Sequence, residues 1–402
     1  MAFQLAFAVL LRLGLALSPL RLILKDDDLL SSPLTSHSRL REGIYLFQHG
    51  IDPYSGGTFR HSPLFLSTFA TVLPSSGVVC ALLWLLVDAA GAWALVQIWR
   101  ARSRLKSSRR DEVIAATYLL NPYIFLPSLS LSTSTFETTL HLISLMFASQ
   151  GQASPALLIL AISTNLSLPS LMLLPPTMLL LLTDPVSHLA SPKPFPAKLT
   201  KTLPLLVEFL AYFAVLVLAC SLVAGGWGWI ESTWGAGILL PDLTPNPGLW
   251  WYFFTEMFDY FRPFFLMVFT MHLLIYVAPV CIKYQHDPLY ATFLLLGIIA
   301  IFKPYPTLSD PGLFLSLIAL FPETYPHLRY PIVTTLLHLH AALLLPLFHH
   351  LWLATGTGNA NFFYASTLVF GIANGGALLD CAWAGLRVAI GEADERWVVL
   401  QE

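Results

Sequence analysis

Two asparagines in the last part of the chain have the side chains best suited to recognising a polar ligand. Asn359 and Asn361 lie in a glycine-containing turn, and Phe362, Phe363 and Tyr364 follow directly. Carboxamides can donate hydrogen bonds to phosphate or sugar oxygens, and aromatic side chains such as Phe362 can contact an acyl chain. A plain turn with asparagine in left-handed backbone geometry explains the same residues. The residues alone leave both interpretations open.

The stretch from residue 241 to residue 266 contains three prolines in its first seven positions and many aromatic side chains after them. Asn246 is a good helix N-cap and Pro247 suits the first helical position, so we expect a helix to begin there. We expect Pro263 to kink or end it. Helical spacing puts on one face Trp251, Phe254, Phe258, Phe261 and Phe265, and on another Tyr252, Glu256 and Asp259. An aromatic belt at a membrane interface would have the same composition.

Other polar clusters point less clearly to chemistry. Asp26, Asp27 and Asp28 follow an apolar run, and an acidic side chain there could act as a general base, but such a run is usually a solvated collar. His338 and His340 do not share a helix face at this spacing, which favours packing between helices over metal binding. The sequence has no phosphate-binding glycine loop and no nucleophile elbow. We therefore expect no catalytic residue, no metal and no cofactor.

Composition places the chain in the membrane. Its 402 residues are 56% hydrophobic and 11% charged, whereas soluble domains are about 25% charged. The net charge of −2 gives no footprint for nucleic acid. The four cysteines lie far apart in apolar runs, so we expect buried thiols. The sequence predicts an all-α polytopic membrane protein with about twelve transmembrane helices.

The positive-inside rule orients these helices. Six of the 21 basic residues lie between positions 100 and 110, which predicts a cytosolic loop over 100–112. We expect residues 1–402 to form one transmembrane domain with both termini in the cytosol. The parts expected on the lumenal side are the first loop over 25–62, a turn and interfacial aromatic helix over 226–262, and a turn over 353–361.

Several motifs occur in the order expected for one known family. They are Asp-Pro-Tyr-Ser-Gly-Gly-Thr-Phe-Arg-His-Ser-Pro-Leu at 52–64, Leu-Asn-Pro-Tyr at 120–123, Pro-Asp-Leu-Thr-Pro-Asn-Pro-Gly-Leu-Trp-Trp-Tyr-Phe-Phe-Thr-Glu-Met-Phe at 241–258, Ile-Phe-Lys-Pro-Tyr-Pro-Thr at 301–307 and Asn-Ala-Asn-Phe-Phe-Tyr-Ala at 359–365. The chain resembles the PIG-U family, the multispanning subunit of the GPI transamidase. The motifs span most of the chain, and the 241–258 block is long and unusual in composition.

The resemblance implies a subunit of an endoplasmic-reticulum complex that attaches GPI anchors to proteins. Catalysis in that complex belongs to a caspase-like cysteine protease subunit, and PIG-U subunits share the architecture of GT-C glycosyltransferases. The family's lipid-contacting asparagines correspond to Asn359 and Asn361, with Phe362 beside them. The block at 250–261, likened to fatty-acid-elongase sequence, suits acyl-chain contact. The residues expected to line or brace the lipid are Asp242, Asn246, Trp251, Phe254, Glu256, Phe258 and Asp259.

One other class of function remains open on sequence alone. A GT-C mannosyltransferase of GPI biosynthesis would take its sugar from dolichol-phosphate-mannose, and its first lumenal loop would hold the catalytic acid. Residues 52–64 resemble that family too. A channel or transporter is less compatible, because the paired broken helices expected for one are not evident.

Overall fold

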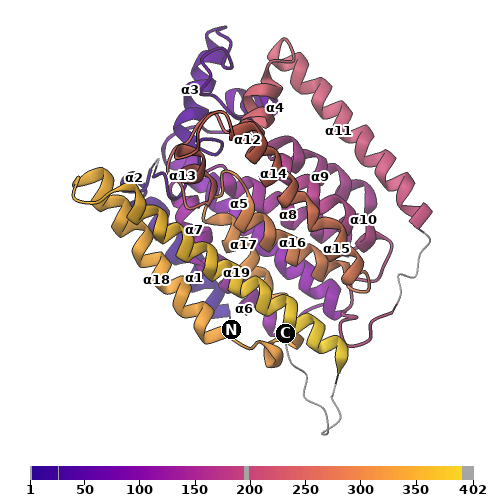
Figure 1. Cartoon of the computed structure of the whole chain (residues 1–402). Coiled ribbons are helices and arrows are strands. Elements are labelled where there is room, and N and C mark those ends of the chain that lie inside the picture. Colours follow the sequence, from indigo (N-terminus) through magenta and orange to yellow (C-terminus); the bar gives the residue numbers. More distant parts are fainter. Residues whose placement is uncertain (1, 26, 194–198, 392–402) are drawn as a thin grey trace.

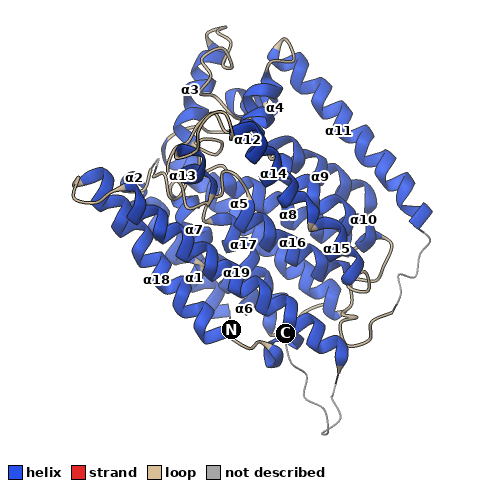
Figure 2. Cartoon of the chain, in the orientation of Figure 1, coloured by secondary structure: helices blue, strands red, loops and turns tan. Residues whose placement is uncertain are grey.

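A computed structural model describes residues 2–25, 27–193 and 199–391 of the chain. These residues form helices joined by turns, with no strand among them (Figure 2). Five helical segments are long and apolar enough to cross a membrane, and further apolar helices of 10–17 residues pack among them. The predicted all-α polytopic membrane fold is confirmed, whereas the total of about twelve spans stays a prediction.

The element bounds follow the chain. The α-helices are α1 (Ala2–Leu17), α2 (Leu20–Ile23), α3 (His37–Gln48), α4 (Pro63–Thr71), α5 (Gly77–Ser103), α6 (Arg110–Leu120), α7 (Pro122–Leu129), α8 (Ser134–Ser149), α9 (Ala153–Leu166), α10 (Leu174–Leu181), α11 (Thr202–Ala224), α12 (Ala236–Leu239), α13 (Trp250–Thr255), α14 (Arg262–Ile275), α15 (Val277–Lys283), α16 (Pro288–Phe302), α17 (Ser309–Leu317), α18 (Pro331–His349) and α19 (Ala360–Ile390). Shorter 3₁₀ or π turns are η1 (Leu168–Leu173), η2 (Leu199–Lys201), η3 (Glu231–Gly235), η4 (Ile318–Leu320), η5 (Pro322–His327) and η6 (His350–Ala354).

Helix α16 forms the centre of the bundle. Residues 288–301 of this helix are all buried, as expected for a helix that is apolar on every side. It packs against α10, α17 and α19. Gly297 allows the closest approach, because a Cβ atom there would lie 2.8 Å from side-chain atoms of Leu378 and Phe314.

Long apolar helices form the edges of the bundle. Figure 1 shows α11 along one edge and the α18–α19 pair along the opposite one. In the most apolar window of α11 only 11% of the residues are buried inside the chain. Apolar surface of this extent suits contact with lipid or with other membrane subunits. The four cysteines, which lie in these and neighbouring helices, are buried and free, as expected.

The basic segment over 100–112 is less of a loop than expected. Helix α5 continues to Ser103, and the guanidinium group of Arg102 is buried at its end. Its nitrogens donate to both carboxylate oxygens of Asp287 at 3.0 and 2.8 Å and to Glu323 at 2.7 Å. Asp287 also caps α16 by accepting from the Tyr290 N–H group. Arg102 is therefore a structural residue, because its partners are distant in sequence and could not be recognised from a charge count.

The single helix expected over most of 247–262 is wrong. Helix α13 covers only Trp250–Thr255, and α14 begins at Arg262 with Pro263 in its first turn. Asn246 does not cap α13; its side-chain oxygen accepts from the Gly248 N–H group at 2.8 Å, which closes a turn before the helix. Backbone bonds from Phe261 to Phe258 and from Arg262 to Asp259 form a second turn between the helices. Local turn formation therefore overrides the helical periodicity.

The first loop, expected over 25–62, also contains regular structure. Helix α3 forms within it, and the Ser36 hydroxyl caps the helix by accepting from the Arg39 N–H group. Arg39 and Arg60 of this segment reach the 232–242 region, as described below. Its placement on the lumenal side, and the orientation of both termini, stay predictions.

Candidate functional site

The sequence motifs meet around residues 241–252. The hydroxyl of Tyr305 donates to the Asp242 carbonyl oxygen at 2.6 Å. A Cβ atom on Gly248 would lie 2.6 Å from the Pro306 ring, so only glycine allows this approach. The guanidinium of Arg39 binds the Asp242 carboxylate at 2.8 Å. Three segments remote in sequence are thus joined at one end of the bundle.

Asp242 holds this junction as an ionised group. Burial alone would raise its pKa, but hydrogen bonds from Thr244 and Arg39 hold the pKa below its usual range. Its second oxygen accepts from the Thr244 backbone N–H group at 3.1 Å. The predicted bracing role of Asp242 fits this position, whereas its carboxylate is already occupied by protein groups.

The two asparagines lie at the start of α19, on the protein surface. Asn359 has extended backbone geometry, with φ −145°, and its Oδ1 atom accepts from the Phe362 N–H group at 3.1 Å. It is thus the N-cap of α19 rather than a left-handed turn residue. The Oδ1 atom of Asn361 accepts from the hydroxyl of Tyr252. With both oxygens engaged, the Nδ2 groups are the atoms that can donate to a ligand.

Aromatic rings connect α13 to this asparagine turn. The buried Trp251 ring stacks on Trp352 at a centroid distance of 6.0 Å and lies 5.6 Å from the Phe363 ring. Tyr364 lies 4.7 Å from Tyr252 and donates its hydroxyl to the Leu249 carbonyl at 3.1 Å. Trp251 therefore braces the turn that carries the asparagines, as predicted by its place in the aromatic block.

An open groove of about 340 Å³ begins beside Tyr252 and continues between α13 and α14. It is lined by Tyr252, Phe253, Glu256, Met257, Phe258, Phe261, Phe265 and Tyr364. The groove is mainly apolar, and Phe258 on its wall is 79% exposed. Since Tyr252 contacts Asn361, polar donors and apolar wall are adjacent. An amphiphile could place its head at the turn and a chain in the groove.

Not every predicted lipid-contacting residue takes part in this arrangement. Phe254 is buried against Trp250 and Phe269 on the other side of α13. Asn246 is buried in its own turn. Asp259 is exposed in the turn between α13 and α14. The structure brings together Asn359, Asn361, Phe362, Trp251, Glu256 and Phe258, and leaves the other three as bracing or surface residues.

Two contributing residues escaped the sequence reasoning. Tyr252 was assigned to an acidic face without a partner, and Tyr364 was noted only as part of an aromatic run. The available signal was spacing, because Asn361 and Tyr364 are three residues apart and share a helix face. Gly248 was also missed, since the need for a close approach depends on a distant proline.

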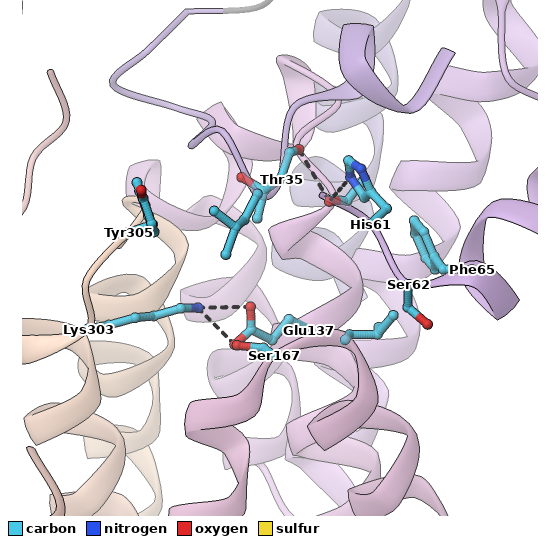
Figure 3. A pocket seen from close by; sticks show the side chains of 11 residues that line it. Thr35, His61, Ser62, Phe65, Glu137, Ser167, Lys303 and Tyr305 are labelled. Carbon is cyan, nitrogen blue, oxygen red and sulfur yellow. Dashed lines mark hydrogen bonds and ion pairs between the residues drawn. The ribbon is translucent and has the colours of Figure 1, made fainter. Parts of the chain in front are cut away.

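The most polar interior cluster lies elsewhere, at the C-terminal end of α16 (Figure 3). The buried Nζ atom of Lys303 binds both oxygens of Glu137 at 2.8 Å and one oxygen of Asp310 at 3.1 Å. The other Asp310 oxygen accepts from the Thr307 N–H group at 2.8 Å. A cavity of about 40 Å³ adjoins this cluster and His61. Burial lowers the pKa of His61 to about 3, so its ring is neutral at neutral pH.

The acidic run and the histidines take up structural contacts. The Asp27 side chain accepts from the Leu29 N–H group at 2.8 Å, and burial raises the pKa of Asp28 while nearby His349 opposes the shift. His338 lies 3.2 Å from the Asn374 side-chain oxygen and bonds to the Thr334 carbonyl. Asp26 lies outside the described residues. Within the described chain, no group of three His, Cys, Asp or Glu side chains is placed to hold a metal.

Comparison with known proteins gives a consistent result. A family model described as GPI transamidase subunit PIG-U matches residues 6–370. The chain is 34% identical over 361 residues to the GPI transamidase component GAB1 of Saccharomyces cerevisiae, which covers 89% of this chain and 87% of that protein. It is 30% identical over 409 residues to the GPI-anchor transamidase component PIGU of Homo sapiens, covering 95% and 93% of the two chains.

Proposed function

This chain belongs to the PIG-U family of GPI transamidase subunits, and from that premise we propose that it is the non-catalytic subunit that recognises the GPI lipid. It is a multi-pass membrane protein and a component of a GPI transamidase. The relatives support this role over a mannosyltransferase that uses dolichol-phosphate-mannose. The endoplasmic-reticulum membrane as its location, the caspase-like cysteine protease subunit as its catalytic partner and cytosolic termini belong to the proposal.

The observation that carries lipid recognition is the hydrogen bond between Tyr252 and Asn361. It joins an exposed pair of amide donors to the apolar groove between α13 and α14. In the proposal, the Nδ2 groups of Asn359 and Asn361 donate to phosphate or sugar oxygens of the GPI headgroup. Each such hydrogen bond contributes about 1 kcal/mol net, and more when the acceptor is charged. One acyl chain lies against Phe258 and its neighbours, while Phe362 contacts the lipid beside the turn.

The absence of a catalytic role is supported by how the buried acids are used. Glu137 and Asp310 are the carboxylates nearest the small polar cavity, and both bind Lys303. A carboxylate already paired with a buried ammonium is held in its charged form and has little basicity to offer a substrate. His61, in the same cavity, is neutral and lies 3.2 Å from the Thr133 hydroxyl. These groups stabilise the fold rather than present a free general acid or base.

The test replaces both amide donors without removing the structural acceptors. Asn359→Asp combined with Asn361→Asp keeps oxygens for the Phe362 N–H group and the Tyr252 hydroxyl, but removes both NH₂ groups and adds charge that repels phosphate. We expect GPI recovered with the purified complex to fall at least about ten-fold, equivalent to two lost hydrogen bonds. Assembly with the other transamidase subunits should remain normal. GPI content is measured by mass spectrometry of the intact complex.

A matched control separates recognition from surface charge. Thr355→Asp combined with Thr357→Asp adds the same two charges to the preceding turn, where both threonines are exposed, without touching the asparagines. This variant should keep most of its GPI. Wild-type GPI content in the Asn359→Asp, Asn361→Asp complex would mean that the headgroup binds elsewhere.

A further inference from the structure

A second apolar cavity lies on the opposite side of α13 from the asparagine turn. Its volume is about 290 Å³, close to the lower end of ligand-binding pockets, about 300–1,000 Å³. Trp250 lines this cavity, whereas its neighbour Trp251 packs toward α19. One short helix thus separates two distinct spaces. Most of the remaining wall is apolar and comes from η1, α12 and α14, including Leu168, Met172, Ile238, Leu273 and Leu274.

The mouth of the cavity faces the membrane. Three apolar lining residues at its edge are exposed: Leu171 by 42%, Ile238 by 42% and Leu274 by 46%. Leu274 belongs to the apolar span Arg262–Lys283, only 17% of whose apolar window is buried inside the chain. A hydrocarbon chain could therefore enter from the bilayer without passing through water.

The other end of the cavity is polar and positively charged. Lys303 and Arg60 both line it, but the Lys303 ammonium is already bound by two carboxylates. Arg60 is different, because its Nη1 atom donates only to a backbone carbonyl, that of Ser232 at 3.1 Å, and its buried Nε atom has no hydrogen-bond partner. The nearby Asp242 carboxylate is paired with Arg39. An arginine with donors to spare suits a phosphate group.

We propose that this cavity holds one acyl chain of a bilayer glycerophospholipid, whose phosphate lies against Arg60. The order of groups matches such a lipid: an apolar wall open to the membrane, then a guanidinium at the end where the chain meets the polar segment over 52–62. The site is separate from the proposed GPI site across α13. The GPI lipid also carries an acyl chain and a phosphate, so the experiment must distinguish the two lipids.

Gly237 provides a way to fill the cavity. It lies on α12 and lines the cavity, and a Cβ atom built there meets nothing within 4 Å. Gly237→Phe should therefore occupy the space of the acyl chain. Gly228→Phe is the matched control, because Gly228 is equally free of contacts but exposed and outside the cavity. Both variants are made in the full chain and purified as the intact transamidase complex in detergent.

The readout is quantitative mass spectrometry of glycerophospholipid and of GPI in the same samples. We expect Gly237→Phe to lose the tightly retained glycerophospholipid, by about ten-fold or more, while Gly228→Phe keeps it. Arg60→Gln should also lower its retention by about ten-fold, the scale of a lost charged hydrogen bond, and Arg60→Lys should restore part of it. Arg41→Gln, which removes an exposed cation of the same segment, should have no effect. GPI content should stay at the wild-type level throughout.

Three results would overturn the proposal. Unchanged phospholipid in an assembled Gly237→Phe complex would show that the cavity holds no such lipid. Loss of GPI, with phospholipid unchanged, would assign the cavity to the GPI lipid itself. If Gly237→Phe prevents assembly, Arg60→Gln decides: unchanged phospholipid in that complex would exclude the lipid and favour a helix of another subunit as the occupant.

Discussion

Helices α16 and α13 show two different ways of holding a segment in this protein. Helix α16 is buried along its length and has a buried cation with two carboxylates at each end: Arg102 with Asp287 and Glu323, and Lys303 with Glu137 and Asp310. Helix α13 is short and has no ion pair of its own among the described contacts. It is held by aromatic rings on two sides, Trp251 toward α19 and Trp250 toward α14.

The difference indicates where stability and ligand binding lie in the molecule. Buried charges tolerate little movement, because a separated partner remains desolvated in a medium of low dielectric constant. Aromatic contacts can adjust to small displacements at lower cost. The charged ends of α16 therefore define a rigid frame, and the two candidate lipid sites lie on either side of the aromatic helix at its rim.

Removing the cation at the end of α16 should have the largest effect. Lys303→Ala leaves Glu137 and Asp310 buried without their partner, so we expect a loss of roughly 3–5 kcal/mol of folding stability and little assembled complex. Thermal unfolding of the purified complex and its yield measure this. The matched variant combines Lys303→Met, Glu137→Gln and Asp310→Asn, which removes all three charges with similar side-chain volumes.

The neutral triple variant also tests the non-catalytic proposal. It should recover most of the stability, because no charge is left unpaired in the interior, and it should retain GPI-anchor attachment. Loss of anchor attachment in a fully assembled triple variant would instead give Glu137 or Asp310 a chemical role. A Lys303→Ala complex as stable as the wild type would contradict the rigid-frame interpretation.

A pair of truncations on α13 should separate its two sides with intermediate effects. Trp251→Ala and Phe254→Ala each remove a buried ring, and each should cost about 3 kcal/mol, the lower end for such changes. Only Trp251→Ala should also lower GPI content, because Trp251 contacts Trp352 and Phe363 beside the asparagine turn. Equal loss of GPI in both variants would show that α13 acts as one unit.

The sequence was most informative where one property persisted over many residues. Long apolar runs predicted the spans, and α11 and α16 begin and end within a few residues of the expected positions. The helix over 247–262 failed because a hydrogen bond within the turn at Asn246 and the packing of Gly248 against Pro306 depend on atoms remote from the periodicity. The same limit applies to Arg102, which was counted as a loop charge although its partner Asp287 is 185 residues away.

The site followed the same division. Asn359 and Asn361 were found from residue type and family motif, and the structure adds that their oxygens are already used by Phe362 and Tyr252. Which aromatic side chains face them could not be deduced, because α13 is too short for its helical spacing to extend to Phe258. Phe254, assigned to the same face as Trp251, packs toward α14 instead.

The smallest expected effect on stability belongs to the exposed wall of the groove. Phe258 is 79% exposed and lines the groove between α13 and α14, whereas Tyr260 is 89% exposed and does not line it. Because neither ring is buried, Phe258→Ala and Tyr260→Ala should each change the unfolding free energy by less than about 0.5 kcal/mol.

Binding should nevertheless distinguish these two surface residues. If an acyl chain of GPI covers Phe258, removing the ring exposes that part of the chain, and GPI should dissociate faster during detergent washes of the Phe258→Ala complex. Loss of one partly buried aromatic contact corresponds to roughly a three- to ten-fold change in retention. Tyr260→Ala should retain GPI like the wild type. Identical wash-out curves for both variants would place the acyl chain outside this groove, while the amide donors of Asn359 and Asn361 could still hold the headgroup.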